Sequence, residues 1–447
     1  MPLSRRQFLV AALAPARPNI LLLLADNWAY PHASAYRGGV PTPTFDRIAA
    51  QGALFHHAFA PNPSCSPSRS GLLTGQWTHA LGPAASLYGP LAPGQPTYPQ
   101  LLAQAGYHVG HSGKGWGPGP GKPAGNPAGP AYPSFTAFLE AKPAKQPFCF
   151  WFGSHDPHVP WTPPANAQPT QLPLPAHLPD APPVRLELNA YAGEVQRFDN
   201  ECAELLTLLT QRNELQNTLI VMSSDNGWQM PRGLANCYDL GVRIPLAIRY
   251  PAHFKSATQR HDFVSLYDLA PTFLAAAGLP LPHPMRHTQS LFSSTKRTRM
   301  FLERERHANV REGNLSYPVR GVRTADYLYL HNLEPDRWPA GDPTYYWAVG
   351  EYGDVDESLT KRYILAEKLE PAFSLAFSKR PAEELYHLPS DPGQIMNVAA
   401  QPLHQKSLKR LRAEVESWRQ ATTDPARPGP WDSFPYTGPR RRQPPPV

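Results

Sequence analysis

Two pairs of oxygen-bearing side chains, far apart in the sequence, share the same setting. The first pair, Asp26 and Asn27, directly follows the apolar run 20–25, and the second, Asp225 and Asn226, follows the run 218–222 after two serines. Hard divalent cations bind carboxylate and amide oxygens, and calcium tolerates irregular geometry and a neutral amide better than magnesium does. Either pair alone would more often be a helix cap or a turn. At matching strand ends, the two pairs together favour a site for one calcium ion.

A cysteine stands in an unusual context in the stretch APNPSCSPSRSGLLTGQ, residues 60–76. A buried structural cysteine normally lies in an apolar run, whereas Cys65 has serines and prolines around it, which favour turns and helix starts. Arg69 follows four residues later, and on its own it would equally suit a surface position at a helix start. The context indicates that Cys65 is there for chemistry.

A third apolar run, residues 148–152, leads to His155, Asp156 and His158. Runs of this kind are typical of strands buried on both faces of a parallel sheet, whose carboxyl ends deliver polar groups to one edge. Three such strands ending in polar clusters predict one site at one sheet edge. His155 could equally be a structural histidine.

The elements that must position these residues alternate between strand and helix. Helical spacing and stop signals occur between the apolar runs, within residues 43–55, 97–110, 194–215 and 263–282, the last helix ending at Gly278. This alternation predicts an α/β layered fold over residues 17–295. Strand-like pieces at 319–333 and 383–399 and an amphipathic helix at 403–422 predict a smaller α+β domain over residues 296–426.

Composition limits the class of protein. At 447 residues with 41% apolar content the chain should be globular with a large core. The 56 prolines predict long, stiff connections around a site, or merely reflect a proline-rich lineage. The net charge of +7 permits anionic partners, but part of it lies in a Pro/Arg-rich tail, residues 427–447, which we expect to be solvated. No nucleic-acid-binding signature accompanies the charge.

Four cysteines exclude a disulfide scaffold, and the pairing of Cys149, Cys202 and Cys237 stays open. Residues 1–16 contain Arg5 and Arg6 before a short apolar run and small residues, which resembles a twin-arginine export signal. The alternative is a frayed basic terminus. The signal predicts a periplasmic or extracellular protein, and no later run is long enough for a membrane span.

Several of these segments together resemble one family. CSPSR fits the C-x-P-x-R signature of the type I sulfatases, and LLTGQ, RPNILLLLADN, GYHVGHSGKG, SHDPHVP and SSDNG resemble other family segments in the same order. Further segments, among them VRIPLAIRYP, SYPVRGVRT and EELYHLPSDPGQIMNVA, resemble the sulfamidases, members related to heparan N-sulfatase. The resemblance covers nearly the whole chain. It implies the alkaline-phosphatase-like α/β fold, a large mixed sheet flanked by helices, with a smaller C-terminal domain carrying an antiparallel sheet and a helix.

The resemblance also implies roles for individual residues. In this family a separate maturation enzyme oxidises the signature cysteine, here Cys65, to formylglycine, whose hydrated aldehyde is the nucleophile. Arg69 would hold that group and neutralise charge, and Lys114 would bridge nucleophile and substrate. His158 would donate to the sulfate or its bridging atom, with His155 a further candidate for substrate binding. The implied ligands of the calcium ion are Asp26, Asn27, Asp225, Asn226 and the modified residue 65.

Three positions depart from the family pattern. Asn27 stands where many relatives carry Asp, Trp116 where many have a histidine, and Leu234 where a lysine usually contacts the sulfate. Leucine can neither donate a hydrogen bond nor carry charge. Another basic residue such as Arg232 could reach the same sulfate oxygen.

The resemblance therefore predicts hydrolysis of sulfate esters or sulfamates, N-sulfoglucosamine-like, of sulfated saccharides. One alternative is a phosphate or phosphonate ester hydrolase on the same fold. The other is a degenerate sulfatase that binds sulfated glycans without turnover, which the substitutions at Trp116 and Leu234 favour and the retained Cys65 and Arg69 oppose.

Overall fold

The computed structural model of the chain describes residues 17–119, 125–162, 172–344, 350–425 and 430–438. A seven-stranded sheet lies at the centre, in the order β3-β4-β1-β5-β6-β2-β7. Its strands are β1 (Asn19–Ala25), β2 (Ala53–Phe59), β3 (His108–Gly113), β4 (Phe148–Gly153), β5 (Thr218–Ser224), β6 (Leu246–Arg249) and β7 (Thr258–Ser265). The first four in the order run parallel, β6 is antiparallel to both of its neighbours, and β2 is parallel to β7. The sheet is mixed, as the family resemblance implies.

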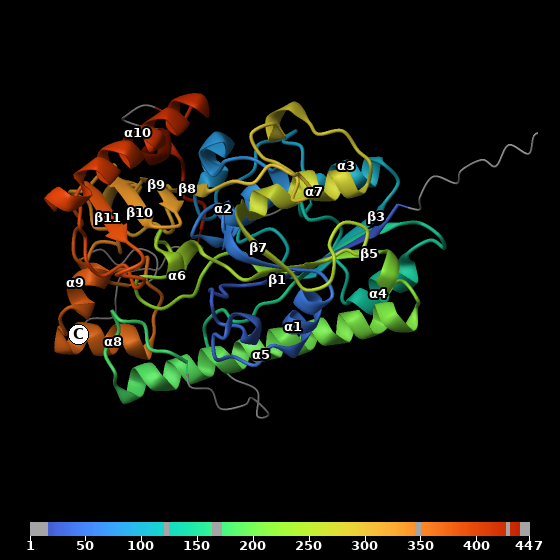
Figure 1. Cartoon of the computed structure of the whole chain (residues 1–447), viewed down its shortest axis with the longest axis horizontal. Coiled ribbons are helices and arrows are strands. Elements are labelled where there is room, and N and C mark those ends of the chain that lie inside the picture. The colour runs from blue at the N-terminus through green and yellow to red at the C-terminus, as the bar shows by residue number, and fades with distance from the viewer. Residues whose placement is uncertain (1–16, 120–124, 163–171, 345–349, 426–429, 439–447) are drawn as a thin grey trace, which may run out of the picture.

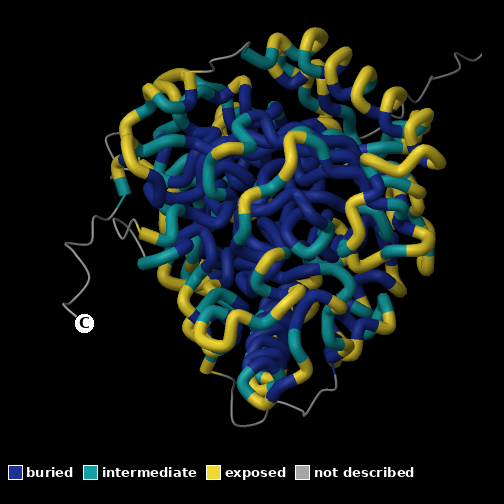
Figure 2. Tube along the Cα trace, turned by 90° about the vertical axis from the view of Figure 1, so that its left-hand side faces the viewer, coloured by how far each residue is buried: buried dark blue, intermediate teal, exposed yellow. Residues whose placement is uncertain are grey.

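Helices cover both faces of this sheet (Figure 1). One face carries α1 (Pro43–Ala50), α4 (Phe135–Ala141) and α5 (Pro182–Gln211), and the other carries α2 (Cys65–Thr74), α3 (Tyr98–Gln104) and α7 (Leu269–Ala276). Successive side chains of a strand point to opposite faces, and in β1 Leu21 and Leu23 enter one core cluster while Leu22 and Leu24 enter the other. Figure 2 shows the resulting buried centre under an exposed outer layer.

Local signals explain where the helices begin and end. Proline occupies the first turn of α1, where its missing N–H removes no hydrogen bond. The Asp199 carboxylate of α5 accepts hydrogen bonds from the backbone N–H groups of Thr44 and Phe45, each at 2.9 Å, and so satisfies the start of α1. Gly75, with a φ of 59°, ends α2 in the left-handed conformation that glycine adopts easily.

The predicted helical stretches are partly right. The stretch 43–55 is helical only to Ala50 and continues as β2, and 97–110 likewise continues as β3. The stretch 263–282 begins as the end of β7 before α7 starts. Conversely, α5 begins at Pro182, well before the predicted 194. The expected stop at Gly52 is right, since α1 ends two residues before it and β2 begins directly after it.

A second, four-stranded sheet lies at one end of the molecule, in the order β11-β10-β9-β8 (Figure 1). Its strands, β8 (Arg299–Arg304), β9 (Val319–Thr324), β10 (Tyr327–Asn332) and β11 (Glu383–His387), are all antiparallel to their neighbours. Helix α10 (Gln405–Ala421) joins their core through the apolar positions Leu408, Leu411, Val415 and Trp418. The predicted antiparallel sheet and amphipathic helix are thus present. The shorter helices α6 (Asp239–Val242), α8 (Leu359–Glu367) and α9 (Ala372–Phe377) complete the chain.

Part of the tail that we expected to be solvated is packed against the protein. In residues 430–438, Trp431 is 3% exposed and Tyr436 is 9% exposed. Asp432 also accepts hydrogen bonds from the Ser316 backbone N–H at 2.7 Å and from Arg337 Nη2 at 2.9 Å. The expectation for this segment was wrong because its aromatic side chains and its carboxylate find partners that overall composition does not reveal.

Two further expectations concern the ends and the cysteines. The twin-arginine-like residues 1–16 and the arginines at 440–442 lie outside the described residues. Within the described ranges, no helix combines the length and apolar character needed to cross a membrane. All four cysteines lie in those ranges, and each is a buried free thiol.

Candidate active site

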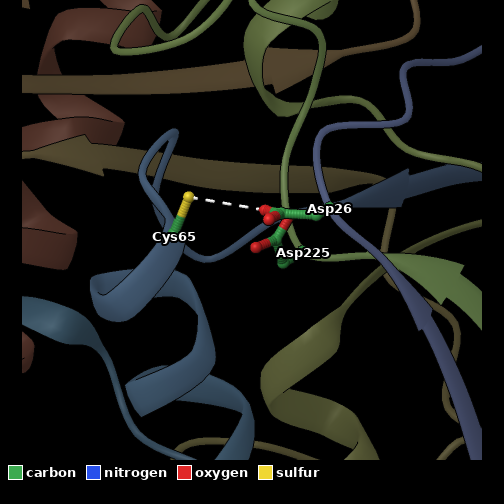
Figure 3. A group of neighbouring side chains, drawn as sticks. All are labelled: Asp26, Cys65 and Asp225. Atoms are coloured by element: carbon green, nitrogen blue, oxygen red, sulfur yellow. Dashed lines mark hydrogen bonds between the residues drawn. The ribbon is translucent and has the colours of Figure 1, made fainter. Parts of the chain in front are cut away.

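Asp26, Cys65 and Asp225 converge at the edge of the large sheet (Figure 3). One ligand atom from each lies within 4.8 Å of the other two, and all three side chains are buried. Cys65 Sγ lies 3.6 Å from Asp26 Oδ1. Three segments that are distant in the sequence therefore meet in one cluster of potential metal ligands.

The pairing of strands explains this convergence. β1 and β5 are neighbours, with Ala25 opposite Ser224, so the residues that follow them leave the sheet side by side. Cys65 is the first residue of α2, which packs on one face of the sheet, and so the helix begins at the same edge. β4 flanks β1 on its other side and delivers the 155–158 segment. These positions confirm that the three predicted polar clusters meet at one edge of the sheet.

The two asparagines complete the cluster. The backbone N–H of Asn27 donates to Asp225 Oδ1 at 3.0 Å, and Asn27 Oδ1 lies 3.8 Å from Cys65 Sγ. Asn226 Nδ2 lies 3.9 Å from the same sulfur. Among the described residues, Asn226 Oδ1 is buried without a hydrogen-bond partner. A buried, unpartnered amide oxygen beside two carboxylates is a donor set that fits a hard divalent cation.

Arg69 is fully buried and ties the cluster together. Its Nε donates to Asp225 Oδ2 at 2.8 Å, and Nη2 lies 3.7 Å from Asp26 Oδ1. Its Nη1 donates to the carbonyl oxygens of Lys114 and Gly115, each at 2.7 Å. Residues four apart lie on one face of a helix, which explains why Arg69 and Cys65 of α2 point to the same place.

Lys114 follows β3 and forms an ion pair with Asp26. Burial alone would raise the pKa of Asp26, but the charges of Lys114 and Arg69 outweigh it and hold that pKa well below its usual range. For Asp225 burial prevails and raises the pKa, despite the contact with Arg69. Burial also raises the pKa of the Cys65 thiol. An unmodified Cys65 is therefore protonated and a poor nucleophile at neutral pH.

Both predicted histidines reach the cavity that opens from the cluster. This cavity has a volume of about 830 Å³ and is lined by Asp26, Cys65 and Lys114 as well as by His155 and His158. A ring nitrogen of His158, Nδ1, lies 2.6 Å from the Val159 carbonyl oxygen, and Nε2 lies 3.1 Å from Gln229 Nε2. His155 is exposed. Five of the predicted site residues thus line one cavity, and the others, Asn27, Arg69, Asp225 and Asn226, lie in the buried cluster next to it.

The residues that depart from the family pattern lie in the same cavity. Trp116 lines it and donates from Nε1 to Ser70 Oγ at 2.8 Å, which fixes the indole. Leu234 also lines it and is 3% exposed. The idea that Arg232 reaches a sulfate oxygen is wrong. Its guanidinium is committed elsewhere, because Nη1 donates to the Leu375 carbonyl at 3.0 Å and the charge lies 3.8 Å from the Tyr238 ring centroid.

Several further residues line the cavity without belonging to any motif that predicted the site. Glu194 and Arg197 lie on α5, and the others come from loops: Tyr88, Asn126, His307, Asp356 and Tyr436. His307 contacts the residue before the cysteine, since its Nδ1 lies 2.8 Å from Ser64 Oγ. Only folding brings these positions to the site, and nothing in their local sequence marks them.

The fold and the site together define a hydrolase of the alkaline-phosphatase-like class, with two buried carboxylates at the carboxyl edge of a mixed sheet. A family model described as Sulfatase matches residues 18–118 and 129–279. A second model, N-sulphoglucosamine sulphohydrolase, C-terminal, matches residues 232–342. The first match covers more than half of the chain, so the chain belongs to the sulfatase family, whose members hydrolyse sulfate esters and sulfamates.

Characterised relatives are similar over most of their length. The N-sulphoglucosamine sulphohydrolase of Homo sapiens is 28% identical, over 93% of this chain and 93% of its own. An ulvan-active sulfatase of Formosa agariphila is 26% identical, over 91% of this chain and 81% of its own.

Solved structures share the fold. BT4656, determined in complex with its substrate D-glucosamine-2-N,6-O-disulfate, superposes with a TM-score of 0.64 and 20% identity, over 91% of this chain and 98% of its own. A phosphonate monoester hydrolase of Agrobacterium radiobacter gives a TM-score of 0.67 and 18% identity, over 91% and 96%. Because one neighbour acts on sulfur and the other is named for phosphorus, the fold alone does not select the reaction.

Proposed function

We propose that this chain removes the sulfate group from a sulfated glucosamine, as a sulfamate or a sulfate ester, through a formylglycine formed at Cys65 and one calcium ion. The observation that carries the proposal is the buried convergence of Cys65, Asp26 and Asp225 beside Arg69 and Lys114. The sugar class is supported by the names of the human relative and of the BT4656 substrate.

The metal would be held by Asp26, Asn27, Asp225 and Asn226 together with the modified residue 65. A bound cation supplies positive charge that polarises sulfate oxygens. The chain's own cations extend that charge. Lys114 and Arg69 stand beside the cluster and neutralise charge on the sulfate, with Arg69 held rigidly by its four contacts.

The chemistry of residue 65 favours modification. A thiol whose pKa is raised by burial stays protonated, whereas the hydrate of an aldehyde offers a hydroxyl as the nucleophile. A separate maturation enzyme would carry out the oxidation. Protonated His158 would give a proton from Nε2 to the departing nitrogen or oxygen, with the Val159 carbonyl accepting from Nδ1 and holding the ring.

The test is sulfate release from glucosamine N-sulfate and glucosamine 6-sulfate by protein produced together with a maturation enzyme. We expect release by the parent, none by Cys65→Ala, and near-parent rates for Cys149→Ala, which alters another buried thiol in the sheet core. An aryl phosphate measured in parallel should be the poorer substrate. Release by Cys65→Ala at the parent rate would show that the proposal is wrong.

Binding without turnover is the second candidate, and Leu234 and Trp116 in the cavity favour it. Neither side chain can supply the charge or the proton that a lysine and a histidine would offer there. This candidate predicts that calorimetry detects binding of the same sulfated sugars while no sulfate is released, even with formylglycine present at residue 65.

Residues 1–16 would direct export to the periplasm or beyond, where sulfated saccharides occur as substrates. We also propose residues 17–295 and 296–426 as the boundaries of the catalytic and C-terminal domains. Fractionation of a bacterial host that makes the full chain tests the export, because Arg5→Lys together with Arg6→Lys should retain the protein in the cytoplasm.

A further inference from the structure

Two tyrosines from distant parts of the chain meet in the wall of the active-site cavity. Tyr88 follows a 3-10 helix, Thr78–Ala85, and Tyr436 belongs to the C-terminal strap, residues 430–438. Their ring centroids lie 5.6 Å apart at an interplanar angle of 77°, an edge-to-face contact. Both line the cavity that contains Cys65 and Lys114. Neither tyrosine belongs to the cluster of Asp26, Cys65 and Asp225 or to a motif that predicted the site.

The backbone of Tyr88 is held in an unusual conformation. Its φ is 64°, in the left-handed region, which bulky residues rarely adopt. Its N–H donates to Ser66 Oγ at 3.2 Å, and its carbonyl accepts from Thr437 Oγ1 at 2.6 Å. Ser66 belongs to α2 and directly follows Cys65, so α2 and the strap together fix the position of Tyr88. Such conformations persist where the surroundings fix them, often beside bound ligands.

The strap is anchored before it reaches the cavity. Trp431 is buried, with the Arg320 guanidinium 5.1 Å from its ring centroid. Asp432 is held by Ser316 and Arg337, as described above. The Phe434 carbonyl accepts from Arg306 Nη1 at 3.2 Å. These contacts deliver Tyr436 to the cavity at a fixed place, as binding residues require.

The rest of the cavity must hold whatever carries the sulfate. Its volume of about 830 Å³ is far larger than one sulfate group needs. In the proposed function, the sulfate would be bound by the calcium ion, Arg69 and Lys114. A sugar ring presents apolar C–H faces and polar hydroxyls, which match the apolar faces and polar tips of tyrosines. Burial raises the pKa of Tyr88 and of Tyr436, so both hydroxyls stay protonated and can donate.

We propose that Tyr88 and Tyr436 form a saccharide subsite that packs against the sugar ring bearing the sulfate, and that the C-terminal strap completes it. The inference rests on the proposed function in that the ligand is a sulfated sugar. It assigns a binding role to a segment that composition alone marks as a tail.

Equilibrium binding measurements test the saccharide subsite without relying on turnover. In the Cys65→Ala background with saturating calcium, calorimetry would compare glucosamine N-sulfate with inorganic sulfate. Tyr436→Ala and Tyr88→Ala should each weaken the sugar by ~10-fold or more while leaving sulfate unchanged, as expected for loss of a buried aromatic contact. Tyr88→Phe should keep most of the affinity, because the ring remains.

The control is Tyr327→Ala, a half-buried tyrosine of β10 that contacts His387 and His404 and does not line the cavity. It should bind both probes like the parent. Asp432→Ala loosens the strap without touching the cavity and should reproduce part of the Tyr436→Ala effect on the sugar, with thermal melting showing that each variant is folded.

The inference is overturned if sugar affinity is unchanged in folded Tyr436→Ala, if sulfate affinity falls equally, or if the Cys65→Ala protein with both tyrosines intact binds the sugar no more tightly than sulfate. A failure of the proposed function looks different. In that case no sulfate is released by the unmutated enzyme, while the sugar still binds and the tyrosine variants still weaken it.

Discussion

Replacing Arg69 by lysine should destabilise the protein strongly although the charge is kept. The guanidinium donates from Nη1 to the Lys114 and Gly115 carbonyls and from Nε to Asp225, all within 2.8 Å in a fully buried setting. A lysine ammonium can stay near Asp225, but it is a single point without the planar fork that reaches both carbonyls. Arg69→Lys therefore leaves the two carbonyl oxygens unpaired.

The expected cost follows from those two acceptors. A buried polar group left without a partner costs ~1–3 kcal/mol, so two of them should lower the free energy of unfolding by ~2–6 kcal/mol. The Lys114 backbone also loses its anchor, so turnover should fall as well. The measurement is urea unfolding of the calcium-loaded protein followed by circular dichroism, with the parent alongside.

Arg412→Lys is the matched control, because Arg412 pairs with Glu383 on the surface with half of its side chain exposed. Exposed ion pairs contribute ~0–1 kcal/mol, so this variant should unfold almost like the parent. If Arg69→Lys also costs under ~1 kcal/mol, the two carbonyl contacts do not stabilise the site as argued here.

Three further predictions concern the cavity. Leu234→Lys should raise turnover of glucosamine N-sulfate by up to ~10²–10³-fold if this position is a lost sulfate contact, and an unchanged or lower rate refutes that idea. Burial raises the pKa of Glu194 to about 7, so it ionises as the pH rises through 7, and affinity for sulfated sugars should fall over that range. Glu194→Gln should remove this pH dependence, and a parent-like profile would exclude Glu194 as its source. Chelation of calcium should lower the melting temperature of the parent but not of Asp225→Asn, because the variant has lost a carboxylate ligand and should hold little calcium before chelation; equal shifts would argue against this metal site.

Most of the candidate cluster could be predicted from the sequence, because its residues lie at or near the ends of strands. Asp26 and Asp225 follow apolar runs that had to be buried parallel strands, and the register of β1 with β5 then leaves little freedom for their side chains. Cys65 and Arg69 lie one helical turn apart, so a single helix places both. Local pattern and sheet topology were enough for these residues.

Other parts of the site depend on packing between distant segments. From the sequence, Arg232 was a candidate for binding a sulfate oxygen. In the structure its guanidinium instead contacts the Leu375 carbonyl and the Tyr238 ring. Tyr436 lies in a proline-rich stretch that composition marks as tail, and only its contact with Tyr88 reveals it. His307 likewise gains its meaning from Ser64. No local periodicity encodes such contacts, since each depends on where a second, remote segment comes to lie.

The central claim is that Cys65 serves as the precursor of the nucleophile, and the mass of one peptide tests it most directly. Trypsin releases residues 48–69 as a single peptide that contains this cysteine. From cells that also make a maturation enzyme, this peptide should have the mass of the aldehyde form and should react with hydroxylamine. A peptide that carries only the unmodified thiol, fully alkylated by iodoacetamide, in a preparation that nevertheless releases sulfate from glucosamine N-sulfate, would contradict the account.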